Sequence, residues 1–179
     1  MSLPRFAALL VAAGLALTAC QQVPVATGPP APEDGASVDS LLDGLKVAKA
    51  GSMKGYSREK FPHWRSTGEN CDVRDSVLKR DGIRVKTSGC NVVAGTWKSV
   101  YDGKTLNSPT LVDIDHVVPL ANAWRSGASA WTTDKRSDFA NDLDDPQLVA
   151  VSSGSNRSKG DQDPSTWKPP SVLDVRSAA

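Results

Sequence analysis

The chain has 179 residues, of which 39% are hydrophobic and 23% charged, and its formal net charge is +1. This length is enough for one domain once a leader and a linker are removed. The near-neutral charge excludes the strong overall basic character of many nonspecific nucleic-acid-binding proteins, so a polyanion would have to be bound by a local patch.

Residues 1–20 have the pattern of an export leader. Arg5 precedes residues 6–17, which are apolar apart from glycine and too few to span a bilayer. The Leu-Thr-Ala-Cys sequence that ends at Cys20 resembles a lipobox, which implies that Cys20 becomes the lipidated first residue of the mature protein. The alternative is cleavage after Ala19 that leaves Cys20 free. We therefore expect an exported protein, either lipid-anchored to the outer face of a bacterial cell membrane or secreted.

A proline-rich stretch follows the leader. Residues 21–38 offer almost nothing to bury, which predicts an extended, disordered linker. The folded domain is expected over residues 39–179. Its first predicted element is a helix over Asp39–Ala50 that packs on the core. The apolar residues on one face of this helix are Leu41, Leu42, Leu45 and Ala48.

The next segment combines an aromatic stretch with a helix and two strands. His63 lies in the aromatic stretch, and we expect it to pack or to lie at the edge of a substrate site rather than to be catalytic. A helix is predicted over Asp72–Arg80. Strands are predicted over Ile83–Lys86 and Gly89–Trp97, with a turn at Asp81-Gly82 between helix and strand.

Export also bears on the cysteines. The chain has three, and setting Cys20 aside leaves Cys71 and Cys90. In an oxidising compartment a disulfide is favoured over a zinc site, which would need four ligands from a chain with two histidines. The bridge would tie the start of the predicted 72–80 helix to the 89–97 strand.

The residues with the clearest chemistry lie at the end of a strand predicted over Thr110–Val118. Strand alternation places Asp113 and Asp115 on one face and His116 on the other. Asp115 and His116 can serve one centre only if the strand ends or twists there. Pro119 favours an end at this point, because it lacks a backbone donor and restricts the residue before it.

The last predicted elements build a second strand and a short helix. The elements are helices over Leu120–Ser126 and Thr133–Phe139, a strand over Pro146–Val151, and a helix that carries Asn156 and Lys159. Trp124 is expected to be buried, and Thr133 to cap its helix. Asn156 and Lys159 are three positions apart and therefore share one helical face.

The motifs Asp-His-x-x-Pro at residues 115–119 and Asn-x-x-Lys-Gly at residues 156–160 resemble the HNH (ββα-metal) endonuclease family. The closest resemblance is to secreted bacterial members related to the C-terminal domain of GmrSD restriction endonucleases. Tyr56-Ser57-Arg58 and Cys71-Asp72 fit the same group, and the resemblance covers roughly residues 41–170. It implies an α+β fold, with a ββα-metal core, added helices and a small disulfide-braced β-region.

The resemblance also implies a reaction, which is metal-dependent hydrolysis of phosphodiester bonds. His116 would be the general base, because its pKa suits proton abstraction near neutral pH. Asp115 and Asn156 would hold one divalent ion through oxygen ligands, which Mg²⁺ prefers. That ion would stabilise negative charge on the phosphate and the leaving oxygen.

Other residues would support this centre. Arg157 or Lys159 would hold the phosphate. Gln147 stands where the superfamily often has an Asn that orients the histidine, and Asn141 is the alternative for that task. Asp113 is expected to be structural rather than a metal ligand.

The substrate would be nucleic acid, with DNA favoured over RNA, contacted through its backbone without sequence specificity. The lipid anchor would be the only membrane association, and no obligate protein partner is evident. Related proteins continue past Pro170 with a long helix, whereas Ser171–Ala179 is short, so we expect the family's C-terminal helix to be missing. The alternative function is therefore a noncatalytic surface lipoprotein, a C-terminally truncated remnant of a nuclease that at most binds polyanions or a partner.

Overall fold

The computed structural model describes residues 38–170, so the predicted leader with Cys20, the linker up to residue 37 and the C-terminal residues 171–179 lie outside the described residues. The chain divides into two compact units, Met1–Lys46 and Val47–Ala179. The described helices include none that is long and apolar enough to cross a membrane.

The first unit contains helix α1, which spans Val38–Asp43 and is much shorter than the predicted 39–50 helix. Gly44 follows its last residue, where glycine commonly ends a helix. Leu41, Leu42 and Leu45 are 58–65% exposed in this unit. Packing of this helix on the core of the second unit stays a prediction.

The second unit mixes short helices with short antiparallel strands, which confirms the predicted α+β class. Its helices are α2 (Val73–Asp81), α3 (Leu120–Arg125), α4 (Thr133–Ala140) and α5 (Ser153–Lys159). Its 3-10 turns are η1 (Arg58–Lys60), η2 (Pro109–Leu111) and η3 (Ala128–Ala130). Its strands are β1 (Ser66–Gly68), β2 (Cys71–Asp72), β3 (Ile83–Ser88), β4 (Asn91–Lys98), β5 (Thr105–Leu106), β6 (Val112–His116) and β7 (Leu148–Ser152).

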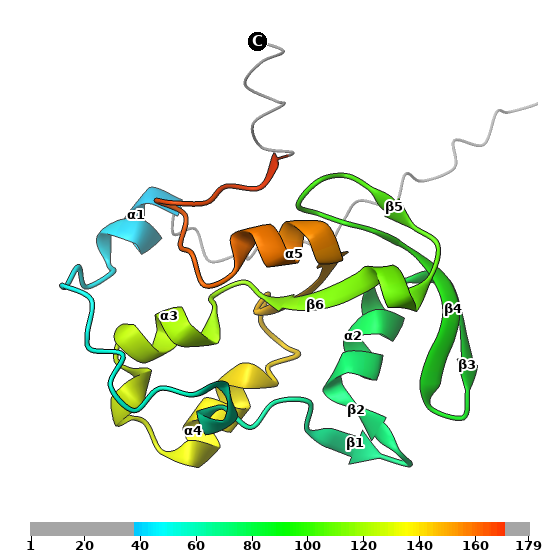
Figure 1. The fold of residues 1–179 in the computed structure, drawn as a ribbon, viewed down its shortest axis with the longest axis horizontal. Coiled ribbons are helices and arrows are strands. Elements are labelled where there is room, and N and C mark those ends of the chain that lie inside the picture. The colour runs from blue at the N-terminus through cyan, green and yellow to red at the C-terminus, as the bar shows by residue number, and fades with distance from the viewer. Residues whose placement is uncertain (1–37, 171–179) are drawn as a thin grey trace, which may run out of the picture. The chain divides into compact units, whose positions relative to one another are not determined.

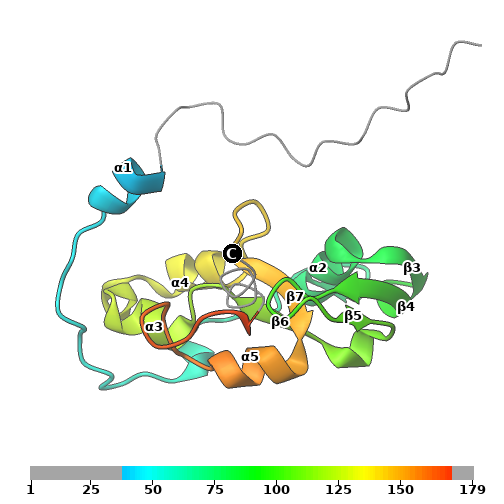
Figure 2. The same cartoon turned by 90° about the horizontal axis from the view of Figure 1, so that it is seen from above.

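The strands form the antiparallel sheets β1–β2, β3–β4–β5 and β6–β7. Within the second unit, α5 lies beside β6, the β3–β4 hairpin lies at one end, and α3 and α4 lie at the other (Figure 1 and Figure 2). The chain therefore forms a strand–strand–helix arrangement from β6, β7 and α5 between the hairpin and the helical end.

Two apolar clusters hold this unit together. In the first, α2 packs against β4, β6 and β7, and the fully buried Trp97 donates its indole N–H to the Leu78 carbonyl at 2.8 Å. In the second, Phe61 packs against Trp124 of α3 and Ala140 of α4. Trp124 is 7% exposed, which confirms its predicted burial. The end of β6 lies where the two clusters meet, because β6 belongs to the first and α3 follows it directly in the second.

Helix caps follow ordinary side-chain chemistry. Asp72 caps α2 and forms a reciprocal capping box with Asp75, so this helix begins one residue after its predicted start. Helix α4 is capped by Thr132, whose Oγ1 accepts the Lys135 N–H at 3.2 Å, and not by Thr133 as predicted. Either threonine fits the cap pattern, and the structure selects the earlier one.

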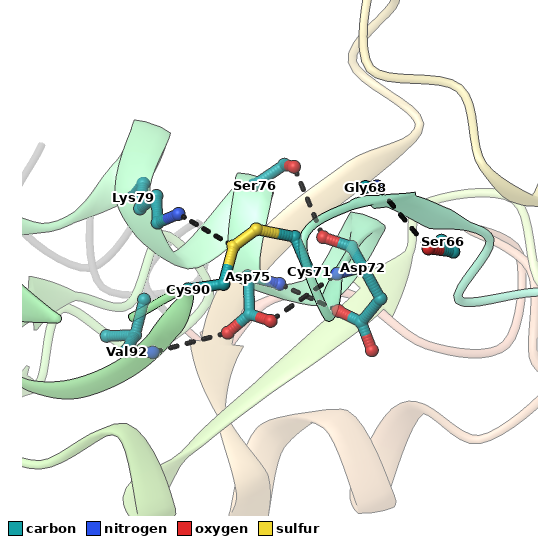
Figure 3. The surroundings of a disulfide bond; sticks show 9 residues. All are labelled: Ser66, Gly68, Cys71, Asp72, Asp75, Ser76, Lys79, Cys90 and Val92. Atoms are coloured by element: carbon teal, nitrogen blue, oxygen red, sulfur yellow. Dashed lines mark hydrogen bonds between the residues drawn. A yellow bond between two sulfur atoms is a disulfide. The ribbon is translucent and has the colours of Figure 1, made fainter. Parts of the chain in front are cut away.

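The predicted disulfide is confirmed between Cys71 and Cys90, whose Cα atoms are 5.2 Å apart. Figure 3 shows it beside Asp75, which links both ends of the bridge region. The Asp75 carboxylate accepts the backbone N–H groups of Asp72 at 3.4 Å and of Val92 at 3.3 Å. The covalent bridge and these bonds therefore join the start of α2 to the start of β4.

Removing this bridge is expected to destabilise the domain. In the chain-entropy picture, a Cys71→Ala/Cys90→Ala variant loses about 3 kcal/mol of unfolding free energy, because the unfolded chain regains the freedom of the closed loop. Urea denaturation of oxidised wild type and of the double variant measures the loss. Reduced wild type is the control and should match the variant, and equal stability of all three proteins would contradict the expectation.

Candidate active site

The β6–β7 hairpin positions the predicted site. Its register is unbroken, and His116, the last residue of β6, lies opposite Leu148. One more main-chain bond extends the ladder, because the Val117 N–H donates to the Gln147 carbonyl at 2.8 Å. The Gln147 side chain then donates from Nε2 to the Val118 carbonyl at 2.9 Å and accepts the Val118 N–H at 3.1 Å. Both polar atoms of this side chain hold the turn after His116, so the effect of Gln147 on the histidine runs through the main chain.

His116 is 4% exposed, and the end of α4 fixes its ring. Its Nε2 lies 3.0 Å from the Ala140 carbonyl oxygen, which can only accept, so Nε2 carries the proton and Nδ1 is left as the basic nitrogen. The Trp64 ring lies beside the imidazole, with 5.9 Å between centroids. Burial lowers the pKa of His116 to about 4. The imidazole is therefore neutral at neutral pH and available to accept a proton, but it is a weaker base than the histidine of ordinary pKa that the sequence predicted.

Asp115 is held by two donors on one oxygen. Its Oδ2 accepts the Tyr101 hydroxyl at 2.6 Å and the Lys159 ammonium at 2.7 Å. The Lys159 and Asp115 side chains are 6% and 7% exposed, so this ion pair is buried. Burial, followed by the hydrogen bond to Asp115, raises the pKa of Tyr101 above its ordinary value, so the phenol stays protonated as a donor.

The predicted alternation along β6 is confirmed by the partners of its side chains. Asp113 and Asp115 both bond to α5, the first through the Asn156 Nδ2 at 3.1 Å and the second through Lys159. His116 bonds to α4 instead. Strand β6 is shorter at both ends than the predicted Thr110–Val118 strand and ends at His116, where the sequence required an end or a twist. Both faces can therefore serve one centre at that end.

A pocket of about 290 Å³ opens at this strand end. Its walls include Asp115 and His116 from β6, Asn156 from α5, and Tyr56 and Arg58 from the segment before η1 and from η1 itself. The structure therefore brings together the predicted base and both predicted metal ligands in one cavity.

The donor atoms in the pocket suit a hard divalent cation. Two bonds occupy Oδ2 of Asp115, which leaves Oδ1, and the bond from Asn156 Nδ2 to Asp113 leaves the Asn156 Oδ1. Carboxylate and amide oxygens are ligands that Mg²⁺ accepts, and it keeps several waters. Residues 38–170 contain no group of three or more His, Cys, Asp or Glu side chains placed to hold a metal. An ion here would therefore take further ligands from water and from a phosphate.

The two predicted phosphate ligands lie elsewhere. Lys159 is 5% exposed, and its ammonium donates to Asp115 and to the His116 carbonyl at 2.9 Å, so it faces the protein rather than the pocket. The Arg157 side chain is 79% exposed and lies 4.0 Å from the Asp113 carboxylate. Neither residue is part of the pocket wall, which differs from the expectation that they hold the phosphate.

Arg58 is the basic residue of the pocket wall. Its Nε donates to Nε2 of His63 at 3.4 Å, and His63 Nδ1 bonds to the Phe61 carbonyl at 2.8 Å. Because that bond uses Nε, the two terminal amino groups of Arg58 are the part that could hold an anion. His63 therefore lies at the edge of the site and supports Arg58, close to the role that the sequence suggested for it.

The sequence analysis did not assign Arg58, Tyr101 or Arg136 to the site, although all three support it in the structure. Arg58 had a signal, because Tyr56-Ser57-Arg58 belongs to the resemblance. Tyr101 precedes a turn, and nothing local predicts that its hydroxyl meets Asp115. Arg136 of α4 is 8% exposed and bonds to the backbone carbonyls of Lys60 and Trp131, yet its sequence context is that of a surface arginine.

The comparisons with known proteins agree with this architecture. Residues 70–171 match the family of the C-terminal domain of GmrSD restriction endonucleases, and the chain belongs to that family. An uncharacterized secreted protein of Arthroderma benhamiae is 52% identical over 148 residues, which cover 82% of this chain and 72% of that protein. That relative is fungal, so it gives no support to the expectation of a bacterial protein. No solved structure matches the chain.

Proposed function

We propose that the chain is a metal-dependent endonuclease of the HNH class that hydrolyses phosphodiester bonds in nucleic acid, with DNA favoured. One observation carries the proposal. A single pocket at the end of β6 contains a neutral imidazole with a free basic nitrogen beside two oxygen donors for a cation. Membership of a family named for restriction endonucleases supports the same class of reaction.

In the proposed reaction, one residue accepts a proton and two others hold the cation. His116 takes a proton at Nδ1 from a water molecule, whose oxygen attacks phosphorus while the leaving oxygen departs on the opposite side. The Ala140 carbonyl keeps accepting from Nε2 and stabilises the resulting imidazolium. Asp115 and Asn156 would hold the divalent ion, for which Mg²⁺ fits the donor set. When bound, such an ion stabilises negative charge on the phosphate and the leaving oxygen.

Arg58 is the proposed phosphate ligand, in place of Arg157 and Lys159. Its guanidinium is on an exposed side chain in the same pocket, and a guanidinium matches phosphate oxygens in a bidentate geometry. Contacts of this kind recognise the backbone and carry no sequence information. We therefore propose cleavage without sequence specificity.

Export is part of the proposal. The A. benhamiae relative is named a secreted protein, and a disulfide joins Cys71 and Cys90, as is common outside the cytoplasm. The substrate would then be extracellular nucleic acid. Lipidation at Cys20 remains a proposal, which mass spectrometry of the exported protein would test.

The function is tested by nicking of supercoiled plasmid DNA. Purified protein is expected to convert the plasmid to open circles with Mg²⁺ and to lose this activity in EDTA, because the donor set holds a cation that the reaction needs. An end-labelled RNA of similar length, assayed in parallel, reports the preference between DNA and RNA. Plasmid and RNA that both stay intact with Mg²⁺ would favour the noncatalytic alternative.

A further inference from the structure

The buried Lys159–Asp115 ion pair raises a question about charge at the proposed cation site. The Lys159 ammonium lies 2.7 Å from the Asp115 Oδ2 and 2.9 Å from the His116 carbonyl oxygen. Both side chains of the pair are nearly fully buried. The ammonium is therefore fixed next to a carboxylate that we assign to a cation, in a region where water screens charge weakly.

The charges around the two donor atoms almost cancel. Asp115 is the one carboxylate of the proposed ligand set, and Lys159 neutralises it. Asn156 contributes a neutral amide. The nearby Asp113 carboxylate accepts from Asn156 and has Arg157 at 4.0 Å. Asp161, the other carboxylate of the pocket wall, is paired with Arg125 at 3.1 Å. A divalent cation that binds to the free protein would thus meet little net negative charge and would be repelled by Lys159.

We propose that Lys159 is a positioning residue that keeps the cation affinity of the free protein low, so that the substrate phosphodiester completes the cation site. This inference rests on the proposed function. The negative charge that the site lacks would come from the phosphate, which Arg58 brings into the same pocket. Cation and phosphodiester then bind cooperatively, and by linkage each strengthens the other by the same factor.

This role differs from a purely structural one in the direction of its effect. If Lys159 only stabilises the fold, its loss leaves cation affinity unchanged or lowers it by disturbing Asp115. If Lys159 weakens cation binding through its charge, its loss strengthens cation binding. A nearby like charge typically changes such an equilibrium by roughly tenfold or more.

The test measures Mn²⁺ binding by the electron paramagnetic resonance signal of free Mn²⁺ at pH 8. All proteins carry His116→Ala, so that the added dinucleotide thymidylyl-thymidine, which has one phosphodiester, stays intact. The proteins compared are this parent, the parent with Lys159→Met, and the parent with Lys86→Met. Lys86 is exposed on β3, so this control removes one lysine charge away from the pocket.

We expect the parent to bind Mn²⁺ weakly alone and roughly fivefold or more tightly with thymidylyl-thymidine. Lys159→Met should bind Mn²⁺ alone roughly tenfold or more tightly than the parent and gain less from the dinucleotide. Lys86→Met should match the parent. An equal or weaker Mn²⁺ affinity in a folded Lys159→Met protein would overturn the inference.

If Lys159→Met does not fold, the inference is tested by comparing the Mn²⁺ affinity of the parent protein with and without thymidylyl-thymidine. This comparison does not need the Lys159 variant. Mn²⁺ affinity that does not change with thymidylyl-thymidine overturns the inference. If wild type then still nicks plasmid with Mg²⁺, the proposed function stands and only the role of Lys159 falls. If wild type cleaves neither DNA nor RNA with Mg²⁺, the proposed function falls, and the inference falls with it.

Discussion

Replacing His116 with alanine is expected to slow phosphodiester cleavage by roughly 10²–10⁴-fold, the contribution of a well-placed general base. The imidazole is buried at the end of β6, and the Ala140 carbonyl fixes its tautomer. Alanine removes the only basic ring nitrogen in the described pocket wall while the hairpin that carries the residue stays paired. Single-turnover cleavage of a labelled duplex in Mg²⁺ measures the loss of rate.

The second histidine of the chain supplies a matched control for this variant. His63→Ala removes a ring that supports Arg58 at 3.4 Å but is not part of the pocket wall. We expect it to weaken cleavage by less than roughly tenfold, because a long hydrogen bond on the exposed side of the site contributes little. A larger loss of cleavage rate for His63→Ala than for His116→Ala would contradict the assignment of His116 as the general base.

Replacing Arg136 with methionine is expected to lower the free energy of unfolding by about 3–5 kcal/mol. The Arg136 guanidinium donates to the Lys60 carbonyl at 2.7 Å, to the Trp131 carbonyl, and to the Thr133 hydroxyl at 3.2 Å. Methionine fills a similar volume but leaves these largely buried acceptors without their donor. Because Ala140 at the end of the same helix holds His116, cleavage should fall as well.

Arg65→Met is the matched control for Arg136→Met. Arg65 forms an exposed ion pair with Asp138, with side chains 51% and 69% exposed. An exposed pair of this kind contributes less than about 1 kcal/mol, because water screens it. Urea denaturation of both variants beside wild type compares the two arginines. Equal losses would contradict the expectation that the buried Arg136, and not the exposed Arg65, contributes most to the stability of the packing around α4.

The sequence predicted the part of the fold that depends on local pattern. Alternating apolar residues and Pro119 predicted a strand that ends near His116, and helical spacing predicted α2 and α3 within a residue or two. The same spacing predicted too long a helix at α1, which ends at Asp43 with Gly44 directly after it. Periodicity indicates which residues would share a face, but a glycine can end the helix before the apolar pattern ends.

The sequence predicted which motif residues form the candidate site, but it did not predict the side chains that these residues contact. Asp115, His116 and Asn156 line one pocket, as the family resemblance implied. The pairing of Lys159 with Asp115 could not be predicted, because it joins residues 44 positions apart and depends on how deeply α5 packs against β6. A lysine near a phosphate site is most simply interpreted as a phosphate ligand. The burial of Lys159 against Asp115 rules out that interpretation here.

Gln147 shows how an unusual residue can satisfy the same structural need. The family resemblance implied that Gln147 takes the position of an Asn that orients the histidine, with Asn141 as the alternative. Its longer side chain instead bonds both polar groups of Val118 and extends the β6–β7 ladder beyond His116. The turn after the histidine is fixed by two hydrogen bonds whose geometry only the folded hairpin reveals.

The most direct test of the nuclease assignment combines one substitution with one chelator. Wild type and His116→Ala, expressed and purified identically, are each incubated with supercoiled plasmid in Mg²⁺ and in EDTA. We predict open circles only from wild type in Mg²⁺, because cleavage needs both the base and the cation. Equal nicking by wild type and His116→Ala in Mg²⁺ would contradict the account, since the activity would then not depend on the pocket at the end of β6.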